Sequence, residues 1–223
     1  MKKFAVAVDG PAGSGKSTVA KEIAKALGIL YIDTGAMYRT VGMACLKKGI
    51  NPADEDAVVA SLDSLDMKIF PEAGGQRILL DGEDITSRIR TEEIGKAASS
   101  VAAYQKVREK LVEIQQGLAK EQSVIMDGRD IGTKVLPDAE VKIYLDASVE
   151  ERAKRRVGEL EAQGKTADLE TIREEIAQRD YQDMHRENSH LCRAEDAVNV
   201  DTTGLDIPAV TAKLLALIAE KTK

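Results

Sequence analysis

The chain has no tryptophan, and aromatic residues make up only 3% of its 223 residues. Proteins that stack the bases of single-stranded nucleic acid rely on aromatic side chains, so this scarcity argues against such a platform. The net charge of −6 argues against a general nucleic-acid surface, because such surfaces are basic. We therefore expect no nucleic-acid partner.

Cysteine and histidine are equally scarce. The two cysteines, Cys45 and Cys192, form no CxxC pair, and the two histidines, His185 and His190, lack metal-ligand spacing to them. A disulfide framework or a zinc site is therefore not expected. We expect the histidines to be solvated or to cap helices rather than to act as catalysts.

Long apolar runs are also missing, since none approaches the roughly 18 residues that a membrane span needs. The first residues resemble a signal peptide only briefly, because Asp9 and a glycine-rich stretch follow where a longer apolar region would be required. We expect a cytoplasmic protein without membrane contact, with a monomer as the default state. The composition, 43% hydrophobic and 31% charged, is that of a globular domain.

Strand-like and helix-like patterns alternate along the chain. An apolar run at 4–8, a glycine loop, a helical pattern at 16–27 and an apolar run at 30–32 predict a βαβ unit and hence a parallel sheet. Further apolar runs at 123–126, 141–145 and 197–200 complete a predicted five-stranded parallel sheet of the α/β class. Helices on both faces are expected at 36–48, 54–65, 91–120, 148–163, 168–187 and 207–220.

The pattern changes between residues 65 and 89. Short strand-like pieces are separated there by 71–75 and by Asp81-Gly82, which is a strong hairpin signal. We predict a small antiparallel lobe at 65–89, inserted into a core formed by 1–64 and 90–223.

The stretch that follows the first strand carries the clearest chemical signal. It matches G-x4-G-K-[ST] and stands between a predicted strand and a predicted helix, as the mechanism of the motif requires. Its glycines let backbone N–H groups approach phosphate oxygens, while Lys16 reaches the β- and γ-phosphates and Ser17 ligates Mg²⁺. A nucleoside triphosphate is therefore predicted to bind at Gly10, Pro11, Ala12, Gly13, Ser14, Gly15, Lys16, Ser17 and Thr18.

The loop alone does not separate a kinase from a GTPase or a motor ATPase. The chain has no Asn-Lys-x-Asp guanine reader, and motors and helicases are normally larger and more basic. A small chain with an inserted lobe and many arginines favours a kinase for a small acidic acceptor.

Several further motifs, in order and over essentially the whole chain, resemble the bacterial cytidylate kinases of the nucleoside monophosphate kinase family. They lie at 9–18, 33–39, 97–108, 127–133, 137–147 and 178–186, and the insertion at about 65–90 matches the enlarged monophosphate-binding lobe of these enzymes. The resemblance implies the P-loop nucleoside monophosphate kinase fold with a short helical lid at about 155–165. It also implies Mg²⁺-assisted transfer from ATP to CMP and dCMP.

By this resemblance, Thr34 and Arg39 belong to the monophosphate site, where the Arg39 guanidinium would clamp the acceptor phosphate. An ordinary surface arginine is the alternative. Ser99 and Arg108 would read the edge of the cytosine. A packing role for Ser99, and a surface ion pair of Arg108 with a neighbouring glutamate, are the alternatives.

The residues Asp127-Gly-Arg-Asp130 follow a predicted central strand, at the end where ligands bind in open α/β sheets. The resemblance places Arg129 on the acceptor phosphate and Asp130 near the sugar and base. Asp127 has the Walker B position, so it is assigned to the water shell of Mg²⁺ or to the acceptor. An Asp-Gly turn would explain Gly128, but not two carboxylates and an arginine together.

Two helical faces carry the remaining candidates. Arg152, Arg155 and Arg156 fall at i, i+3 and i+4, and the resemblance puts one or two of them in a lid over the triphosphate. We assign a catalytic role to Arg156, with a solvated face paired with Glu151 and Glu159 as the alternative.

On the second face, Arg179 and Arg186 would approach the phosphates, and Asp183 would hold the acceptor ribose. Family members often have another arginine between them, which this chain lacks. The predicted catalytic set is Lys16, Arg129, Arg156 and Arg179. No general base is expected, because the acceptor phosphate is already ionised.

Two other functions fit these residues. One is a kinase of the same fold with a different small acceptor, and the other is a nucleotide sensor without activity. Consumption of ATP only when a monophosphate is added would separate a monophosphate kinase from a sensor.

Overall fold

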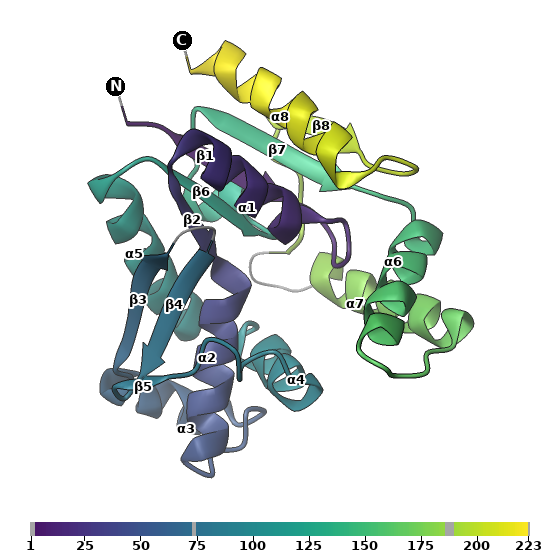
Figure 1. Ribbon diagram of the computed structural model, residues 1–223. Coiled ribbons are helices and arrows are strands. Elements are labelled where there is room, and N and C mark those ends of the chain that lie inside the picture. The colour runs from purple at the N-terminus through teal and green to yellow at the C-terminus, as the bar shows by residue number, and fades with distance from the viewer. Residues whose placement is uncertain (1–2, 73–74, 186–189, 223) are drawn as a thin grey trace.

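The computed structural model describes residues 3–72, 75–185 and 190–222. Its main sheet has five parallel strands in the order β2-β6-β1-β7-β8 (Figure 1). These strands are β1 (Ala5–Asp9), β2 (Leu30–Asp33), β6 (Val124–Gly128), β7 (Val141–Asp146) and β8 (Val198–Asp201). The α/β class and the five-stranded parallel sheet predicted from the sequence are confirmed.

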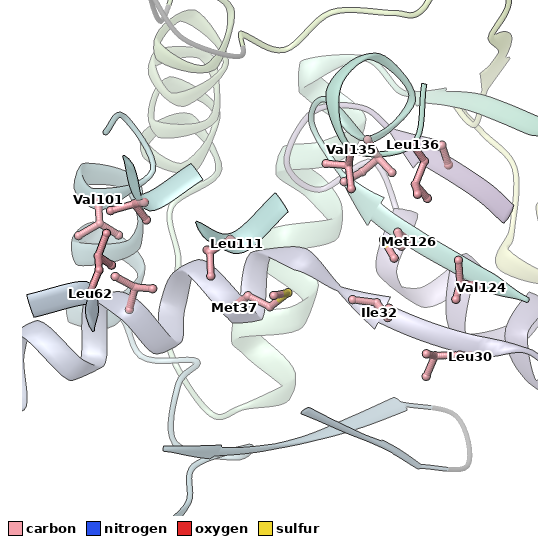
Figure 2. Packing of buried hydrophobic residues seen from close by; sticks show 14 of the residues in the cluster. Leu30, Ile32, Met37, Leu62, Val101, Leu111, Val124, Met126, Val135 and Leu136 are labelled. Carbon is pink, nitrogen blue, oxygen red and sulfur yellow. The ribbon is translucent and has the colours of Figure 1, made fainter. Parts of the chain in front are cut away.

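Helices cover both faces of the sheet, because its strands direct apolar side chains to both sides. The flanking helices are α1 (Lys16–Leu27), α2 (Thr34–Lys47), α5 (Gln105–Glu121) and α8 (Ile207–Lys221). On one face, Ile23 of α1 and Leu214 of α8 share an apolar cluster with the strands. On the other face, Met37 of α2 and Leu111 of α5 share a second cluster with Met126 of β6 (Figure 2).

The insertion forms a separate small antiparallel sheet that packs against α2. Its strands are β3 (Met67–Glu72), β4 (Gly75–Leu80) and β5 (Glu83–Asp84), preceded by α3 (Glu55–Ser61) and the 3-10 turn η1 (Leu62–Ser64). Ile78 and Leu80 of β4 share a buried cluster with Met43 and Ala44 of α2. The antiparallel lobe is therefore present, while the division of the chain at residues 65 and 89 into separate domains stays a prediction.

The stretch 91–120, predicted as one helical region, is divided into α4 (Glu92–Val101) and α5. Thr91 Oγ1 accepts a hydrogen bond from the N–H of Ile94 at 3.3 Å and so caps α4. At the break, the Tyr104 N–H turns back to the carbonyl of Val101, and the Tyr104 hydroxyl donates to the carbonyl of Pro52 at 2.9 Å. This long-range contact overrides the local preference for helix.

Beyond the end of β7, α6 (Val149–Ala162) and α7 (Leu169–His185) form a helical hairpin whose two arms pack together (Figure 1). The predicted lid at 155–165 covers the second half of α6 and the turn that follows it. Within the described part of the chain, no helix combines the length and the apolar character that crossing a membrane would demand.

Candidate active site

The phosphate loop connects β1 to α1 and is shaped by its glycines. Gly10 has φ +146°, and a Cβ atom there would lie 2.0 Å from the carbonyl oxygen of Leu145. A side chain is therefore excluded at the point where the loop leaves the sheet. The Lys16 ammonium donates to the carbonyl of Pro11 at 2.6 Å, so it lies over the loop's own backbone at the start of α1.

Asp127, at the end of β6, connects the phosphate loop to β2. The Ser17 hydroxyl donates to Asp127 Oδ2 at 2.7 Å, and the Tyr31 hydroxyl donates to Oδ1 at 2.8 Å. Thr34 Oγ1 donates to the backbone carbonyl of Asp127 at 2.8 Å. Burial, followed by the nearby charge of Asp33, raises the pKa of Asp127. Ser17 and Asp127 thus bring together oxygen atoms, which are the ligands that Mg²⁺ prefers.

Arg108 and Asp130 form a buried ion pair, with each side chain 8% exposed. The Arg108 guanidinium also lies 5.5 Å from the ring centre of Tyr38 and donates to the carbonyl of Ala102 at 3.3 Å. The alternative of a surface ion pair for Arg108 is therefore wrong. Ser99 is half-buried on α4, one turn before Ala102.

Arg129 links the segment after β6 to α7. Its Nε donates to Asp183 Oδ2 at 2.9 Å, and the Asp183 side chain is 2% exposed. The structure therefore brings together two residues that were predicted to serve the acceptor from different parts of the chain. Arg186, predicted on the same helical face as Asp183, lies outside the described residues.

Positive charges gather around this edge of the sheet. Burial and then the charge of Arg129 lower the pKa of Lys16, and Arg179 lowers it further. Burial, followed by the charges of Arg179 and Arg90, lowers the pKa of Arg39. Desolvation and then Arg129 lower the pKa of Arg179 to about 10, although its side chain remains exposed at the surface. Such mutual repulsion is relieved when an anion binds among the cations.

Two of the three arginines on α6 contact the phosphate loop. The buried Arg152 donates to the carbonyl of Ala12 at 3.0 Å and pairs with Asp180 of α7 at 2.6 Å. Arg155 donates to the carbonyl of Ser14 at 3.4 Å and to that of Thr202 at 2.8 Å. Both side chains support the loop by binding its backbone carbonyls or those beside it.

Arg156 differs from its two neighbours. Its exposed guanidinium pairs with Glu159 at 3.0 Å, as the alternative of a solvated helical face describes. After burial and nearer charges, its positive charge adds to the lowering of the pKa of Arg39 and of Arg179. A catalytic role for Arg156 stays a prediction.

Asp9 belongs to the motif at 9–18, but the sequence alone assigns no role to its side chain. Its two carboxylate oxygens accept hydrogen bonds from the N–H groups of Ile131 and Gly132, each at 2.8 Å. Both belong to η2 (Ile131–Val135), a single π-helical turn directly after Asp130. Burial raises the pKa of Asp9 to about 6, against the opposing effect of these two bonds. Its place at the carboxyl end of a central strand was the signal available in the sequence.

Gln76 of the inserted lobe and Arg90, which directly follows the lobe, were also missed. The Gln76 amide oxygen accepts from the N–H of Asp33 at 3.0 Å, and its amide nitrogen donates to the Asp33 carbonyl at 3.1 Å. Arg90 pairs with the Asp33 carboxylate at 2.6 Å. Asp33 directly precedes Thr34, so these contacts fasten the lobe beside the predicted acceptor site. Asp33 lies 43 positions from Gln76 and 57 from Arg90 in the sequence, so no local sequence pattern predicts these bonds.

Comparison with known proteins agrees with this geometry. The family model described as cytidylate kinase matches residues 6–220. The chain is 52% identical over 217 residues to a cytidylate kinase of Caldicellulosiruptor saccharolyticus, covering 97% of this chain and 96% of the relative. It is 47% identical over 222 residues to a cytidylate kinase of Bacillus subtilis, covering 100% of this chain and 99% of the relative.

Among solved structures, an uncharacterised protein from Eubacterium ventriosum matches with a TM-score of 0.55 and 14% identity, over 98% of this chain and 99% of that one. A gluconokinase from Sinorhizobium meliloti matches with a TM-score of 0.50 and 16% identity, over 98% and 94% of the two chains. These two structures share the fold. The family model and the curated relatives show more, and the chain belongs to the cytidylate kinase family.

Proposed function

We propose that this protein transfers the γ-phosphoryl group of ATP to CMP, and also to dCMP, with CDP or dCDP and ADP as products. The observation that carries the proposal is geometric: Ser17 of the phosphate loop bonds to Asp127, and Arg129, held by Asp183, follows two residues later at the same edge of the sheet. The repulsion among cations that lowers the pKa of Lys16, Arg39 and Arg179, after burial, supports it. Phosphoryl transfer between two nucleotides brings several negative charges together, and cations held in place lower the barrier by stabilising them.

The donor half of the site is the phosphate loop. The loop N–H groups and Lys16 would hold the ATP phosphates, and Arg152 and Arg155 would keep the loop in shape through its carbonyls. Ser17 would ligate Mg²⁺, with Asp127 acting through a water molecule, because the Ser17 hydroxyl and Asp127 Oδ2 lie only 2.7 Å apart. Bound Mg²⁺ would neutralise charge on the phosphates and help to align them.

The acceptor half lies across the carboxyl edge of the sheet. Arg39, Arg129 and Arg179 would hold the CMP phosphate in line with the donor. Arg108 can donate to the acceptor atoms O2 and N3 of cytosine, and a carboxylate such as Asp130 can accept from its amino group. Ser99 would add a hydroxyl to the same edge. Asp183 would hold the ribose, while Arg129 stays oriented by their ion pair.

The lid at 155–165, including Arg156, would close over the triphosphate and exclude water, which otherwise competes as acceptor. We extend the proposal to a monomer working in the cytoplasm. Gel filtration at micromolar concentration tests the monomer.

The decisive assay is coupled ADP release with CMP, dCMP, UMP, AMP and GMP as acceptors. We expect rapid ADP release with CMP and dCMP, and almost none without a monophosphate. A preference for AMP or GMP would overturn the acceptor assignment. ATP binding without turnover on any of the five acceptors would instead indicate a sensor.

A further inference from the structure

The turn η2 is capped in an unusual way. Asp130 stands at its N-cap position, where an aspartate side chain normally accepts hydrogen bonds from the first N–H groups of the turn. Asp130 makes no such bond. The N–H groups of Ile131 and Gly132 are instead satisfied by Asp9, which reaches them from β1 across 122 and 123 residues of sequence.

This exchange leaves the Asp130 carboxylate available for another partner. It turns to Arg108 on α5, where both side chains are buried. Without Asp9, the two freed N–H groups would be buried donors without an acceptor, which is costly, and the Asp130 side chain at the N-cap is placed to satisfy that of Gly132, the second residue of the turn. Capping the turn and pairing with Arg108 would then compete for one carboxylate.

We infer that Asp9 is a positioning residue for the acceptor base: by capping η2 in place of Asp130, it keeps the Asp130 carboxylate on Arg108. The inference rests on the proposed function, in which Arg108 and Asp130 read the cytosine. The packing leaves little freedom at this point, because a Cβ atom at Gly132 would lie 3.2 Å from Cδ of Lys142 and 3.4 Å from Asp9 Oδ2.

The effect of Asp9 should fall mainly on the acceptor half. The backbone of Asp9 is held between Gly128 of β6 and Tyr144 of β7 by strand pairing, whatever its side chain does. The phosphate loop that follows is therefore anchored by the sheet. The carboxylate makes its hydrogen bonds to η2 and acts on Lys16 only through its charge, so its loss should alter recognition of CMP far more than binding of ATP.

The test is Asp9→Asn, in which an amide group would oppose one of the two N–H donors. We expect the KM for CMP to rise about tenfold and the preference for CMP over UMP to fall by a similar factor, as expected for a buried donor left unsatisfied. The KM for ATP should stay within about twofold of the wild-type value. Val141→Ala, which removes buried packing from β7 without touching η2, is the matched control and should leave the preference unchanged.

A double-variant cycle shows whether Asp9 acts through Asp130. In an Asp130→Ala background, Asp9→Asn should change the KM for CMP by less than about twofold. Additive effects, or a change in stability with CMP kinetics untouched, would overturn the inference. If Asp9→Asn does not fold, Asp9→Ser, whose hydroxyl can accept one N–H, gives the same measurements. A wild-type protein that fails to phosphorylate CMP would refute the proposed function instead.

Discussion

Lys16 holds a buried positive charge among other positive charges. Burial and the neighbouring Arg129 both disfavour its charged form, which is why its pKa lies below the usual value. Lys16→Ala should reduce kcat by at least about 100-fold, because a fixed cation at the transferring group is lost. The free energy of unfolding should not fall, since removing the side chain also removes the desolvated charge.

Coupled ADP assays and urea unfolding measure these two effects. Lys25→Ala, an exposed lysine on the same helix, is the control and should change neither quantity. Turnover retained by Lys16→Ala would contradict the role of the loop, and a large loss of stability would contradict the argument from burial.

Asp9 should give the protein's stability a pH signature. Burial raises its pKa from 3.8 to about 6, so the folded state holds this proton more tightly than the unfolded state does. The stabilisation is fully present below pH 3.8 and is lost as the pH rises through about 6. Relative to Asp9→Asn, the wild type should lose about 2 kcal/mol of unfolding free energy between pH 4 and pH 7.

Urea unfolding of both proteins across this range gives the difference directly, and contributions from titrating groups that do not interact with Asp9 cancel in it. Parallel stability profiles for the two proteins would show that the Asp9 carboxyl group titrates at an ordinary pKa in the folded state.

Single residues could be predicted where the motif that contains them is contiguous. Lys16 and Ser17 follow from the spacing of one loop, and Asp127 from the end of an apolar strand. The buried pairing of Arg108 with Asp130 could not be predicted, because 22 residues and a whole strand separate the two. Local spacing shows only the neighbours along a helix, and those suggested a surface ion pair for Arg108.

At the scale of elements, the pair of Arg152 and Asp180 joins α6, α7 and the phosphate loop. Their side chains are 4% and 9% exposed, so removal of one partner leaves an uncompensated buried charge. Arg152→Met should lower the free energy of unfolding by about 3 kcal/mol or more, and adding Asp180→Leu should recover much of that loss. Urea unfolding of the two single variants and the double variant measures the coupling.

The matched control is Arg173→Met, which breaks an exposed pair with Glu170 on the same helix α7. That change should stay within about 0.5 kcal/mol. A double variant no more stable than Arg152→Met alone would mean that the arginine contributes mainly through its bonds to backbone carbonyls.

Regular elements were the most predictable part of the fold, and irregular joints the least. The buried strands have continuous apolar runs, which mark them in the sequence. The break between α4 and α5 falls at Ala102-Ala103-Tyr104, where no glycine or proline gives a signal. The turn η2 depends on an acceptor supplied by β1, so its own residues do not indicate it.

At the scale of the whole molecule, strand order assembles the site. Pairing of β2 with β6 sets Asp33 opposite Asp127, and pairing of β6 with β1 sets Gly128 opposite Asp9. The sequence predicts that the carboxyl ends of these strands meet at one edge, since parallel strands must align. It does not predict how the inserted lobe reaches that edge, because this depends on two polar side chains that contact Asp33.

Polar side chains join the lobe to the core next to a cavity. A cavity of about 130 Å³ lies between the two, lined by residues that include Lys21, Tyr31 and Thr86. The shared cluster on α2 and the ion pair of Lys47 with Glu83 also join the lobe to the core, while Gln76 bonds to Asp33, the residue next to Thr34 of the predicted acceptor site.

Gln76→Ala should loosen this attachment. The N–H and carbonyl of Asp33 would lose their partner, which should cost about 1–3 kcal/mol of unfolding free energy. CMP would then have to order the lobe on binding, so its KM should rise about fivefold or more while the KM for ATP stays unchanged. Arg77→Ala, on the exposed face of the same strand, is the control and should affect neither substrate. Equal losses for ATP and CMP in Gln76→Ala would mean that Gln76 supports the whole core, and that the lobe does not serve the acceptor alone.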